Sequence, residues 1–210
     1  MLKAVKVLVL VVAGGIMLFA GGVVALWFLA MPSNGQALAE TAGIPRPAVI
    51  AHRGASYLAP EATHAAYLMA RELGADYLEL DVQRTRDGVL VALHDDTLAR
   101  TSNVAEVFPD RAGNGVDTFT FAELQQFDAG GWFNQRFPER GRNTFKGLRV
   151  LRLQDILSIA EGASPRRGIC IETKQTHRIP ALEEQLVREL QQRSWVSDSA
   201  LLMAVLRRDP

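Results

Sequence analysis

The sequence predicts an α/β fold in which a parallel sheet carries helices on its outside, as in α/β barrels. Apolar segments typical of buried strands alternate with amphipathic segments from residue 48 onward, which is the pattern of strands joined by crossover helices. Polar residues directly follow several of these strands, and α/β barrels place their active sites at the carboxyl ends of their strands. Only 163 of the 210 residues follow residue 47, whereas a closed eight-stranded barrel usually takes about 250. We therefore expect an incomplete barrel of about five strands.

The first 31 residues are predicted to form a transmembrane helix. Residues 7–31 contain no charged side chain, Lys3 and Lys6 precede them, and Pro32 follows. This length spans a bilayer and exceeds the apolar part of a usual signal peptide. Because no further Lys or Arg occurs before Arg46, the N-terminus is expected in the cytoplasm and the rest of the chain on the outer, extracytoplasmic side.

A cleaved signal peptide is the alternative to this anchor. Ala37-Leu38-Ala39 has the A-x-A form of a cleavage site, and cleavage near Ala39 would release a secreted protein. The length of the apolar stretch favours the uncleaved anchor. Residues 32–47 are rich in Pro, Gly, Ser and Asn and are predicted to be a linker, so that residues 48–210 form the α/β domain.

The domain is expected to begin with a short strand at residues 48–51, and His52 and Arg53 stand at its carboxyl end. A helix is expected from residue 60 to about Leu73, and Gly74 ends it.

The segment 77–82 is the expected second strand and carries two acids. Glu79 and Asp81 lie two positions apart, so both side chains project from the same face of the strand end. Two neighbouring buried carboxylates repel each other and lose hydration, and a bound Mg²⁺ or Ca²⁺ removes both costs. The alternative is a strand end that reaches solvent with two surface acids.

A third strand is expected at residues 89–93, after the pair Asp87-Gly88, which is a strong hairpin signal. His94 stands at its carboxyl end. A long loop at 97–119, a short helix from Thr120 to Phe127 and a turn at 128–133 are expected to follow.

Residues 153–162 are predicted to be helical, and residues 168–174 form a further expected strand with Glu172 and Lys174 two positions apart. An amphipathic helix at 179–193 and a strand at 200–206 are expected after it. Core packing alone does not explain polar residues at the ends of so many strands.

Charge balance and cysteine content argue against nucleic-acid binding and rule out an intrachain disulfide. Basic and acidic side chains number 23 each, which gives no support to nucleic-acid binding, because that needs a basic surface. The single cysteine, Cys170, lies in an apolar run and is expected to be a core residue; it allows no intrachain disulfide.

Six short motifs, in order and at plausible spacing between residues 48 and 175, resemble the glycerophosphodiester phosphodiesterase family. One motif alone is weak, whereas six in register are specific. Ala62 departs from the pattern, because the family usually has Asn there, and this change is expected to loosen the first helix cap or the surroundings of the site. The motifs are His52-Arg53-Gly54, Pro60-Glu61-Ala62-Thr63, Glu79-Leu80-Asp81, His94-Asp95-Asp96-Thr97-Leu98, Phe121-Ala122-Glu123-Leu124 leading to Asp128-Ala129-Gly130, and Ile171-Glu172-Thr173-Lys174.

The resemblance implies a TIM barrel of the (β/α)8 type, here truncated after about the fifth strand, because the family's later strands are missing. It implies that Glu79, Asp81 and Glu172 hold one divalent cation, Ca²⁺ or Mg²⁺, against a phosphate oxygen. This cation neutralises the charge that builds up in the transition state.

The resemblance also implies the other site residues. His52 and His94 are expected to be the general base and general acid, because an imidazole pKa of about 6.5 lets one be neutral and the other protonated near pH 7. Arg53 and Lys174 are expected to bind phosphate oxygens, although Lys174 could instead pair with Glu172. Water and a neighbouring glycerol hydroxyl both stay open as the attacking group.

The expected function is hydrolysis of glycerophosphodiesters to sn-glycerol 3-phosphate and an alcohol, in lipid metabolism. A lysophospholipid or another lipid-linked diester is an alternative substrate, because the anchor would place the site beside a membrane. A truncated, non-catalytic remnant is the competing interpretation, since an open sheet with exposed edges is prone to associate. A purely structural domain does not explain the polar residues at the strand ends.

Overall fold

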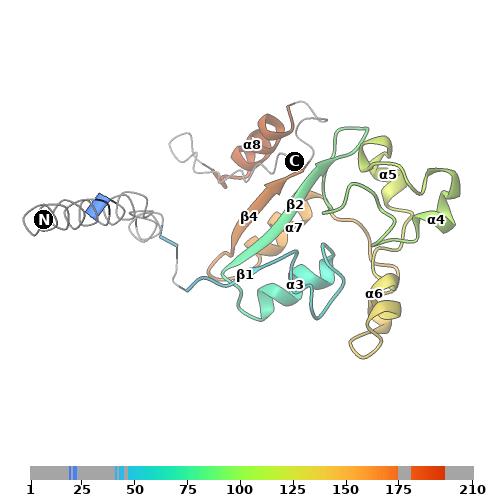
Figure 1. Cartoon of the computed structure of the whole chain (residues 1–210), viewed down its shortest axis with the longest axis horizontal. Coiled ribbons are helices and arrows are strands. Elements are labelled where there is room, and N and C mark those ends of the chain that lie inside the picture. Colours follow the sequence, from blue (N-terminus) through green and yellow to red (C-terminus); the bar gives the residue numbers. More distant parts are fainter. Residues whose placement is uncertain are drawn as a thin grey trace, which may run out of the picture. The chain divides into compact units, whose positions relative to one another are not determined.

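The computed structural model describes residues 47–174 and 181–196, together with Phe19, Gly21, Gly22, Thr41, Gly43 and Ile44. The chain divides into two compact units, Met1–Arg46 and Pro47–Pro210 (Figure 1). Nearly all of the predicted transmembrane helix and linker, and the whole of the predicted strand 200–206, lie outside the described residues. Within the described ranges, no helix combines the length and the apolar character needed to cross a membrane.

Four strands form one sheet around β2 (Tyr77–Arg84). β1 (Ile50–Ala51) and β4 (Gly168–Thr173) pair with β2 in parallel, whereas β3 (Leu90–Ala92) pairs with it antiparallel. The prediction of a wholly parallel sheet is therefore wrong for β3. The turn after β2 reverses the chain at once, and only a longer crossover could have made β3 parallel.

The register of the strands explains why several loops meet at one place. β4 pairs with one edge of β2 along Tyr77–Val82, so β1 and β3 must share the opposite edge. β1 pairs with the first two residues of β2, and β3 returns along its last three. The carboxyl ends of β1 and β3 thus approach each other from opposite directions beside the middle of β2.

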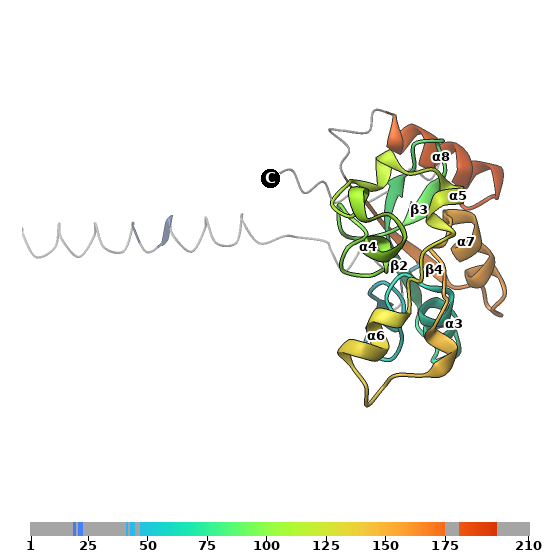
Figure 2. The same ribbon diagram turned by 90° about the vertical axis from the view of Figure 1, so that its right-hand side faces the viewer.

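Helices cover one face of this sheet. α3 (His64–Glu72), α7 (Leu153–Glu161) and α8 (Leu182–Gln192) lie along the same side of the strands (Figure 2). The alternate residues Leu78, Leu80 and Val82 of β2 are fully buried in the apolar core with them. Period-two alternation along β2 then turns its odd-numbered residues to the other face.

The predicted helices are present, although α3 begins at His64 and not at residue 60 and the helix predicted at 120–127 covers only Phe121–Leu124. Thr63 caps α3 through its hydroxyl, which accepts a hydrogen bond from the backbone N–H of Ala66. The helix predicted at 153–162 is α7, and the predicted helix at 179–193 contains α8, whose Leu182, Leu186 and Leu190 are buried. The amphipathic pattern was therefore a sufficient guide to these elements.

The segments predicted as loop and turn contain more structure than expected. Residues 97–119 include α4 (Val104–Val107) and the 3-10 helices η1 (Pro109–Arg111) and η2 (Val116–Thr118). α5 (Phe121–Leu124) begins at a capping box formed by Thr120 and Glu123. The predicted turn at 128–133 runs into α6 (Gly131–Arg136), which is followed by η3 (Asn143–Phe145).

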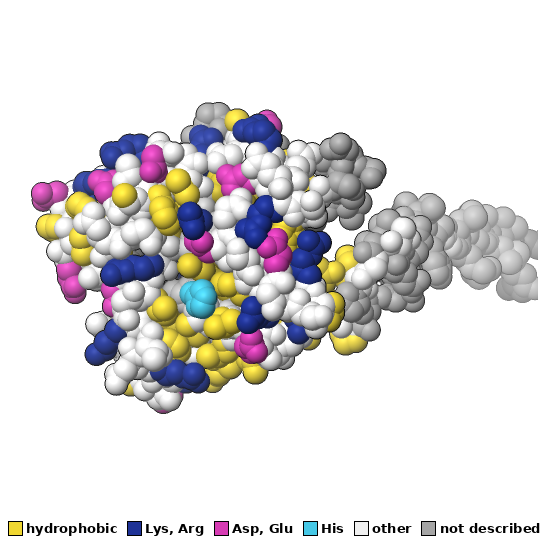
Figure 3. Space-filling view, turned by 180° about the vertical axis from the view of Figure 1, so that it is seen from behind, with side chains coloured by type: hydrophobic (Ala, Val, Ile, Leu, Met, Phe, Trp, Pro, Cys, Tyr) yellow, Lys and Arg dark blue, Asp and Glu magenta, His cyan; other side chains and the backbone are white. Residues whose placement is uncertain are grey.

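Aromatic side chains hold these short elements in place. Phe119 and Phe127 are fully buried and pack edge to face, with ring centroids 5.7 Å apart. Phe133 of α6 packs in the same way against Phe145, also at 5.7 Å. On the face shown in Figure 3, acidic and basic side chains are interspersed among hydrophobic ones, so this face carries mixed charge.

Candidate active site

Three carboxylates meet on the face of the sheet opposite the helices. Glu79 and Asp81 are alternate residues in the middle of β2, not at its end, and are 8% and 3% exposed. Glu172 of β4 stands directly opposite Asp81 in the register of the two parallel strands. Each residue offers a carboxylate oxygen, and these three atoms lie within 4.8 Å of one another. The predicted cation ligands are thus brought together.

The charge of this acidic cluster is only partly compensated. Burial, together with the negative charge of Asp81, raises the pKa of Glu79 to about 7, although the hydrogen bond from the backbone N–H of Arg53 acts in the opposite direction. Neither carboxylate oxygen of Asp81 accepts a hydrogen bond from the described residues; they lie in ion pairs, with Arg53 Nε at 3.2 Å and Lys174 Nζ at 3.0 Å. Three close oxygen donors of this kind fit a hard divalent cation.

Lys174 lies within the cluster. Its ammonium nitrogen is 2.5 Å from a Glu172 oxygen and 3.0 Å from Asp81 Oδ1, and its pKa is raised because both acids favour the charged form more than burial opposes it. The pairing with Glu172 that the sequence left open is therefore present.

The turn after β1 directs Arg53 toward the acids. Arg53 has a left-handed backbone, with φ of 55°, and its N–H donates to Glu79 Oε2 at 2.7 Å. The next residue, Gly54, has φ of 80°, and a Cβ there would lie 2.7 Å from the backbone of Ala66. This turn requires a strained backbone at Arg53 and a glycine at position 54. It positions the Arg53 N–H to donate a hydrogen bond to the Glu79 carboxylate.

Ala62 lies in a second left-handed position beside this turn. Its φ is 57°, and its N–H donates to the carbonyl oxygen of Arg53 at 3.0 Å. Asn tolerates this conformation better than Ala does. Ala in place of the family's Asn at position 62 therefore does not alter the cap of α3, which is Thr63. It places a residue that tolerates the left-handed backbone less well where the chain contacts the Arg53 turn.

Three odd-numbered residues of β2, Glu79, Asp81 and Gln83, each bind a different segment near the site. Glu79 binds the Arg53 N–H, and Asp81 pairs with Lys174. Gln83, which is 1% exposed, donates to the carbonyl oxygens of Leu93 at 2.9 Å and Asp95 at 2.7 Å. His94 lies between Leu93 and Asp95 in the chain, so Gln83 fixes the backbone on both sides of His94. Gln83 was not predicted as a site residue, although it follows Asp81 by the same i, i+2 step that separates Asp81 from Glu79.

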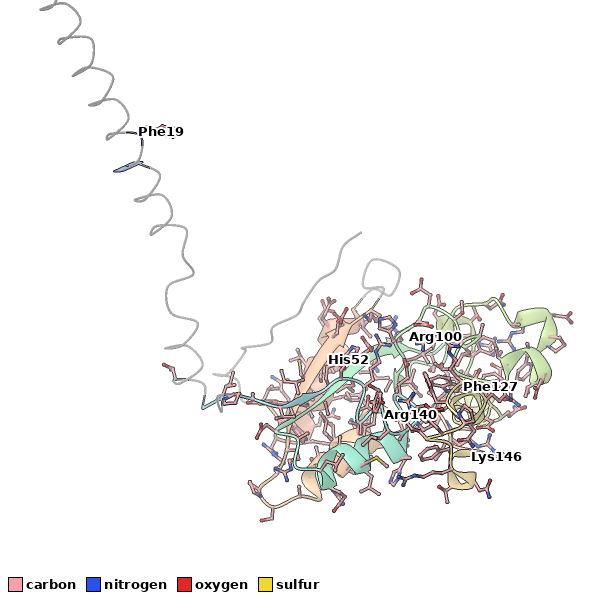
Figure 4. The ribbon with its side chains drawn as sticks, turned by 60° about the horizontal axis from the view of Figure 1, so that its bottom comes forward. Phe19, His52, Arg100, Phe127, Arg140 and Lys146 are labelled. Carbon is pink, nitrogen blue, oxygen red and sulfur yellow. The ribbon has the colours of Figure 1, made fainter. Side chains whose placement is uncertain are left out.

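Of the two predicted catalytic histidines, His52 directly follows β1 and His94 lies two residues after β3. His52, labelled in Figure 4, is exposed. It lines an open hollow of about 640 Å³. His94 is half-buried, and its Nδ1 lies 2.7 Å from Asp95 Oδ1, which leaves Nε2 as the free ring nitrogen. His94 does not line that hollow.

An ion-pair network surrounds the histidines. Arg100 pairs with both oxygens of Asp95 and both oxygens of Glu61, at 2.5–3.0 Å. Hydrogen bonds from Arg100, and then from His94, lower the pKa of Asp95 to about 2. Glu61 also accepts from Arg53 Nη1 at 2.9 Å, so one acid bridges two arginines. Glu61 was expected at a helix start or in the surroundings of the site, and Arg100 was not predicted, because their contact spans 39 residues.

The residues of this site lie within the part of the chain that resembles known proteins. A sequence model of the glycerophosphoryl diester phosphodiesterase family matches residues 52–204. The chain belongs to this family. A glycerophosphodiester phosphodiesterase from Bacillus subtilis (strain 168) is 35% identical over 167 residues, which make up 79% of this chain and 53% of that protein.

Two solved structures resemble the chain. The glycerophosphodiester phosphodiesterase of Agrobacterium tumefaciens C58 is 40% identical, with a TM-score of 0.51 over 69% of this chain and 53% of that one. An Oleispira antarctica phosphodiesterase, solved with its product sn-glycerol-3-phosphate, is 30% identical, with a TM-score of 0.54 over 72% and 54%. The chain thus spans about half the length of these relatives. The family implies a fold of the TIM-barrel type, of which the described residues form one part.

Proposed function

We propose that the chain hydrolyses glycerophosphodiesters to sn-glycerol 3-phosphate and an alcohol, with a divalent cation. The observation that carries this proposal is the convergence of Glu79, Asp81 and Glu172 within 4.8 Å, beside turns that bear the two histidines. Membership of the family supports it independently.

In this proposal Glu79, Asp81 and Glu172 hold one Ca²⁺ or Mg²⁺ through carboxylate oxygens. When bound, the cation would neutralise charge on the phosphate in the transition state. Arg53 reaches the same place and can donate to phosphate oxygens in a two-pronged contact. Lys174, already among the acids, would bind a phosphate oxygen with its ammonium group.

His52 and His94 carry the proton transfers. One imidazole takes the proton from the attacking oxygen, and the other gives a proton to the departing alcohol. The hydrogen bond of His94 Nδ1 to Asp95 suits the second ring nitrogen of His94 to this work, because it fixes both the tautomer and the direction of the ring. Arg100 and Glu61 in turn hold Asp95.

A lipid-linked diester such as a lysophospholipid is the second candidate substrate. The uncharged stretch at 7–31, with lysines before it, supports a single-pass anchor followed by a linker at 32–47 and a catalytic domain at 48–210 on the outer side of the membrane. Such an anchor would hold the site beside lipid head groups. Release after cleavage near Ala39 would free the domain from the membrane instead.

Release of glycerol 3-phosphate from glycerophosphoglycerol by the purified chain tests the proposal. Chelator should stop the release, and Ca²⁺ or Mg²⁺ should restore it. Glu172→Gln should lower the rate at least about tenfold, whereas Glu184→Gln, on the exposed side of α8, should keep it. Indifference to chelator would exclude the carboxylate cluster, and no release with either cation would favour the non-catalytic remnant.

A further inference from the structure

We propose that the hollow beside His52 takes the alcohol group of the diester and prefers an alcohol that carries a further anionic group, such as a second phosphate. This inference rests on the proposed function for the identity of the ligand. It adds a specificity residue, Arg136, on the wall of the hollow.

The hollow lies beside the proposed phosphate region, where a substituent of the diester must extend. One side is formed by His52, Arg53 and Glu61, which belong to the proposed phosphate and proton-transfer region, and the other side by the α6 segment. A diester whose phosphate lies at Arg53 therefore extends one of its two substituents toward α6. A volume of about 640 Å³ is enough for a sugar-like or polyol group.

Charge distinguishes this hollow from a neutral one. It contains the three arginines Arg53, Arg100 and Arg136, but Glu61 is the one acid among its lining residues. Arg53 and Arg100 are already paired with Glu61. Arg136 is exposed and has no acidic partner in the described part of the chain, so its guanidinium is the group that an anion can neutralise.

The aromatic side chains of the wall disfavour a cationic alcohol such as choline. The guanidinium of Arg100 lies 6.0 Å from the Trp132 ring centroid, and that of Arg140 lies 4.2 Å from the Phe137 centroid (Figure 4 labels both arginines). Aromatic rings bind quaternary ammonium groups through cation–π contacts, and these rings already hold cations. A further positive charge would be repelled by the arginines.

The wall is fixed to the other side of the hollow. Arg140 Nη1 donates to the carbonyl oxygen of Tyr57 at 2.5 Å, and its guanidinium lies 4.1 Å from the Tyr57 ring centroid. This contact joins the segment after α6 to the loop between β1 and α3. Arg136 therefore faces the hollow from a supported element and not from a free loop.

Equilibrium binding in the presence of chelator, which prevents cation-dependent turnover, tests the inference by titration calorimetry. The probes are glycerophosphoinositol 4-phosphate, glycerophosphoinositol and glycerophosphocholine. The wild-type chain should bind glycerophosphoinositol 4-phosphate about fivefold more tightly than glycerophosphoinositol, because one partly exposed ion pair is gained. It should bind glycerophosphocholine most weakly. Arg136→Gln should remove the preference between the two inositol probes.

Arg142→Gln is the matched control. Arg142 is also exposed and lies 5.7 Å from the Phe145 ring centroid, much as Arg136 lies 5.8 Å from Phe137, but it is not among the residues that line the hollow. This variant should keep the preference. Equal binding of the inositol probes by the wild type, no binding of any probe, or equal loss in both variants would overturn the inference. Preferential binding without hydrolysis when cation is added would support it and contradict the proposed function.

Discussion

The ammonium nitrogen of Lys174 lies 3.0 Å from Asp81 Oδ1, inside a cluster of three acids. Asp81 is almost completely buried, so its charge depends on this cation and on Arg53 for compensation. A divalent ion bound by the same acids would supply much more positive charge. Lys174 therefore compensates part of the negative charge of the three acids when no metal ion is bound.

Lys174→Met should destabilise the cation-free protein by about 2 kcal/mol, because it leaves the buried Asp81 with Arg53 as its remaining cation and removes the ion pair of Glu172. Adding Mg²⁺ should restore more stability to the variant than to the wild type. Urea unfolding with chelator and with Mg²⁺ measures both effects. Lys146→Met, at an exposed position of the same domain, is the control. The same Mg²⁺ response in wild type and Lys174→Met would show that lysine and cation do not share the site.

Cation binding should release a proton below pH 7. Burial raises the pKa of Glu79 to about 7, above its usual value of 4.5, so between these values the folded, cation-free protein holds a proton that the unfolded chain has lost. Protonation of Glu79 thus favours the folded state, and this contribution is lost as pH rises through 7. The cation must displace the same proton, so its affinity should be about tenfold weaker at pH 6 than at pH 8.

Calorimetry in buffers of different ionisation enthalpy counts the released protons. About one proton per cation is expected at pH 6 and almost none at pH 8. A proton count that stays constant between these pH values would mean that Glu79 is not a ligand or is already ionised.

Asp95→Asn should lower kcat about tenfold or more while changing KM by less than about threefold, because Asp95 orients His94 and does not touch the phosphate. Asp96→Asn, at the exposed neighbouring position, should leave both constants near the wild-type values. Steady-state kinetics on glycerophosphoglycerol measures the split. A change confined to KM would show that Asp95 acts on binding instead.

Ala62→Asn should stabilise the protein by about 0.5–1 kcal/mol, because Asn accepts the left-handed backbone of this position with less strain. Ala65→Asn should do the opposite, since residue 65 is helical and Asn is a weaker helix former than Ala. Urea unfolding compares the two. Loss of stability in Ala62→Asn would mean that side-chain crowding, not backbone strain, controls this position.

The parts of the site that depend on local spacing are predictable from the sequence. The i, i+2 step predicts that Glu79 and Asp81 share a face, and the repeated strand pattern brings in Glu172. The direction of β3 was wrong although the Asp87-Gly88 turn already indicated a hairpin. That reversal is what turns the carboxyl end of β3 back toward the middle of β2.

Other features depend on contacts between distant segments, which residue patterns do not encode. The Glu61–Arg100 pair spans 39 residues and is set by how two loops pack. α6 has six residues, too few to show helical periodicity, so residues 128–133 were expected to form a turn and the helix was not predicted. The left-handed backbones of Arg53 and Ala62 also follow from tertiary contacts, since neither residue type favours them.

The rate of glycerophosphoglycerol hydrolysis by His52→Ala and His94→Ala tests the central claim most directly. Each variant should lose at least about a hundredfold in kcat with added Mg²⁺ or Ca²⁺, while its unfolding free energy stays close to that of the wild type. His64→Ala, on the exposed side of α3, should keep the wild-type rate. If both His52→Ala and His94→Ala hydrolysed the diester at near wild-type rates, the two imidazoles would not be the acid and base of this site.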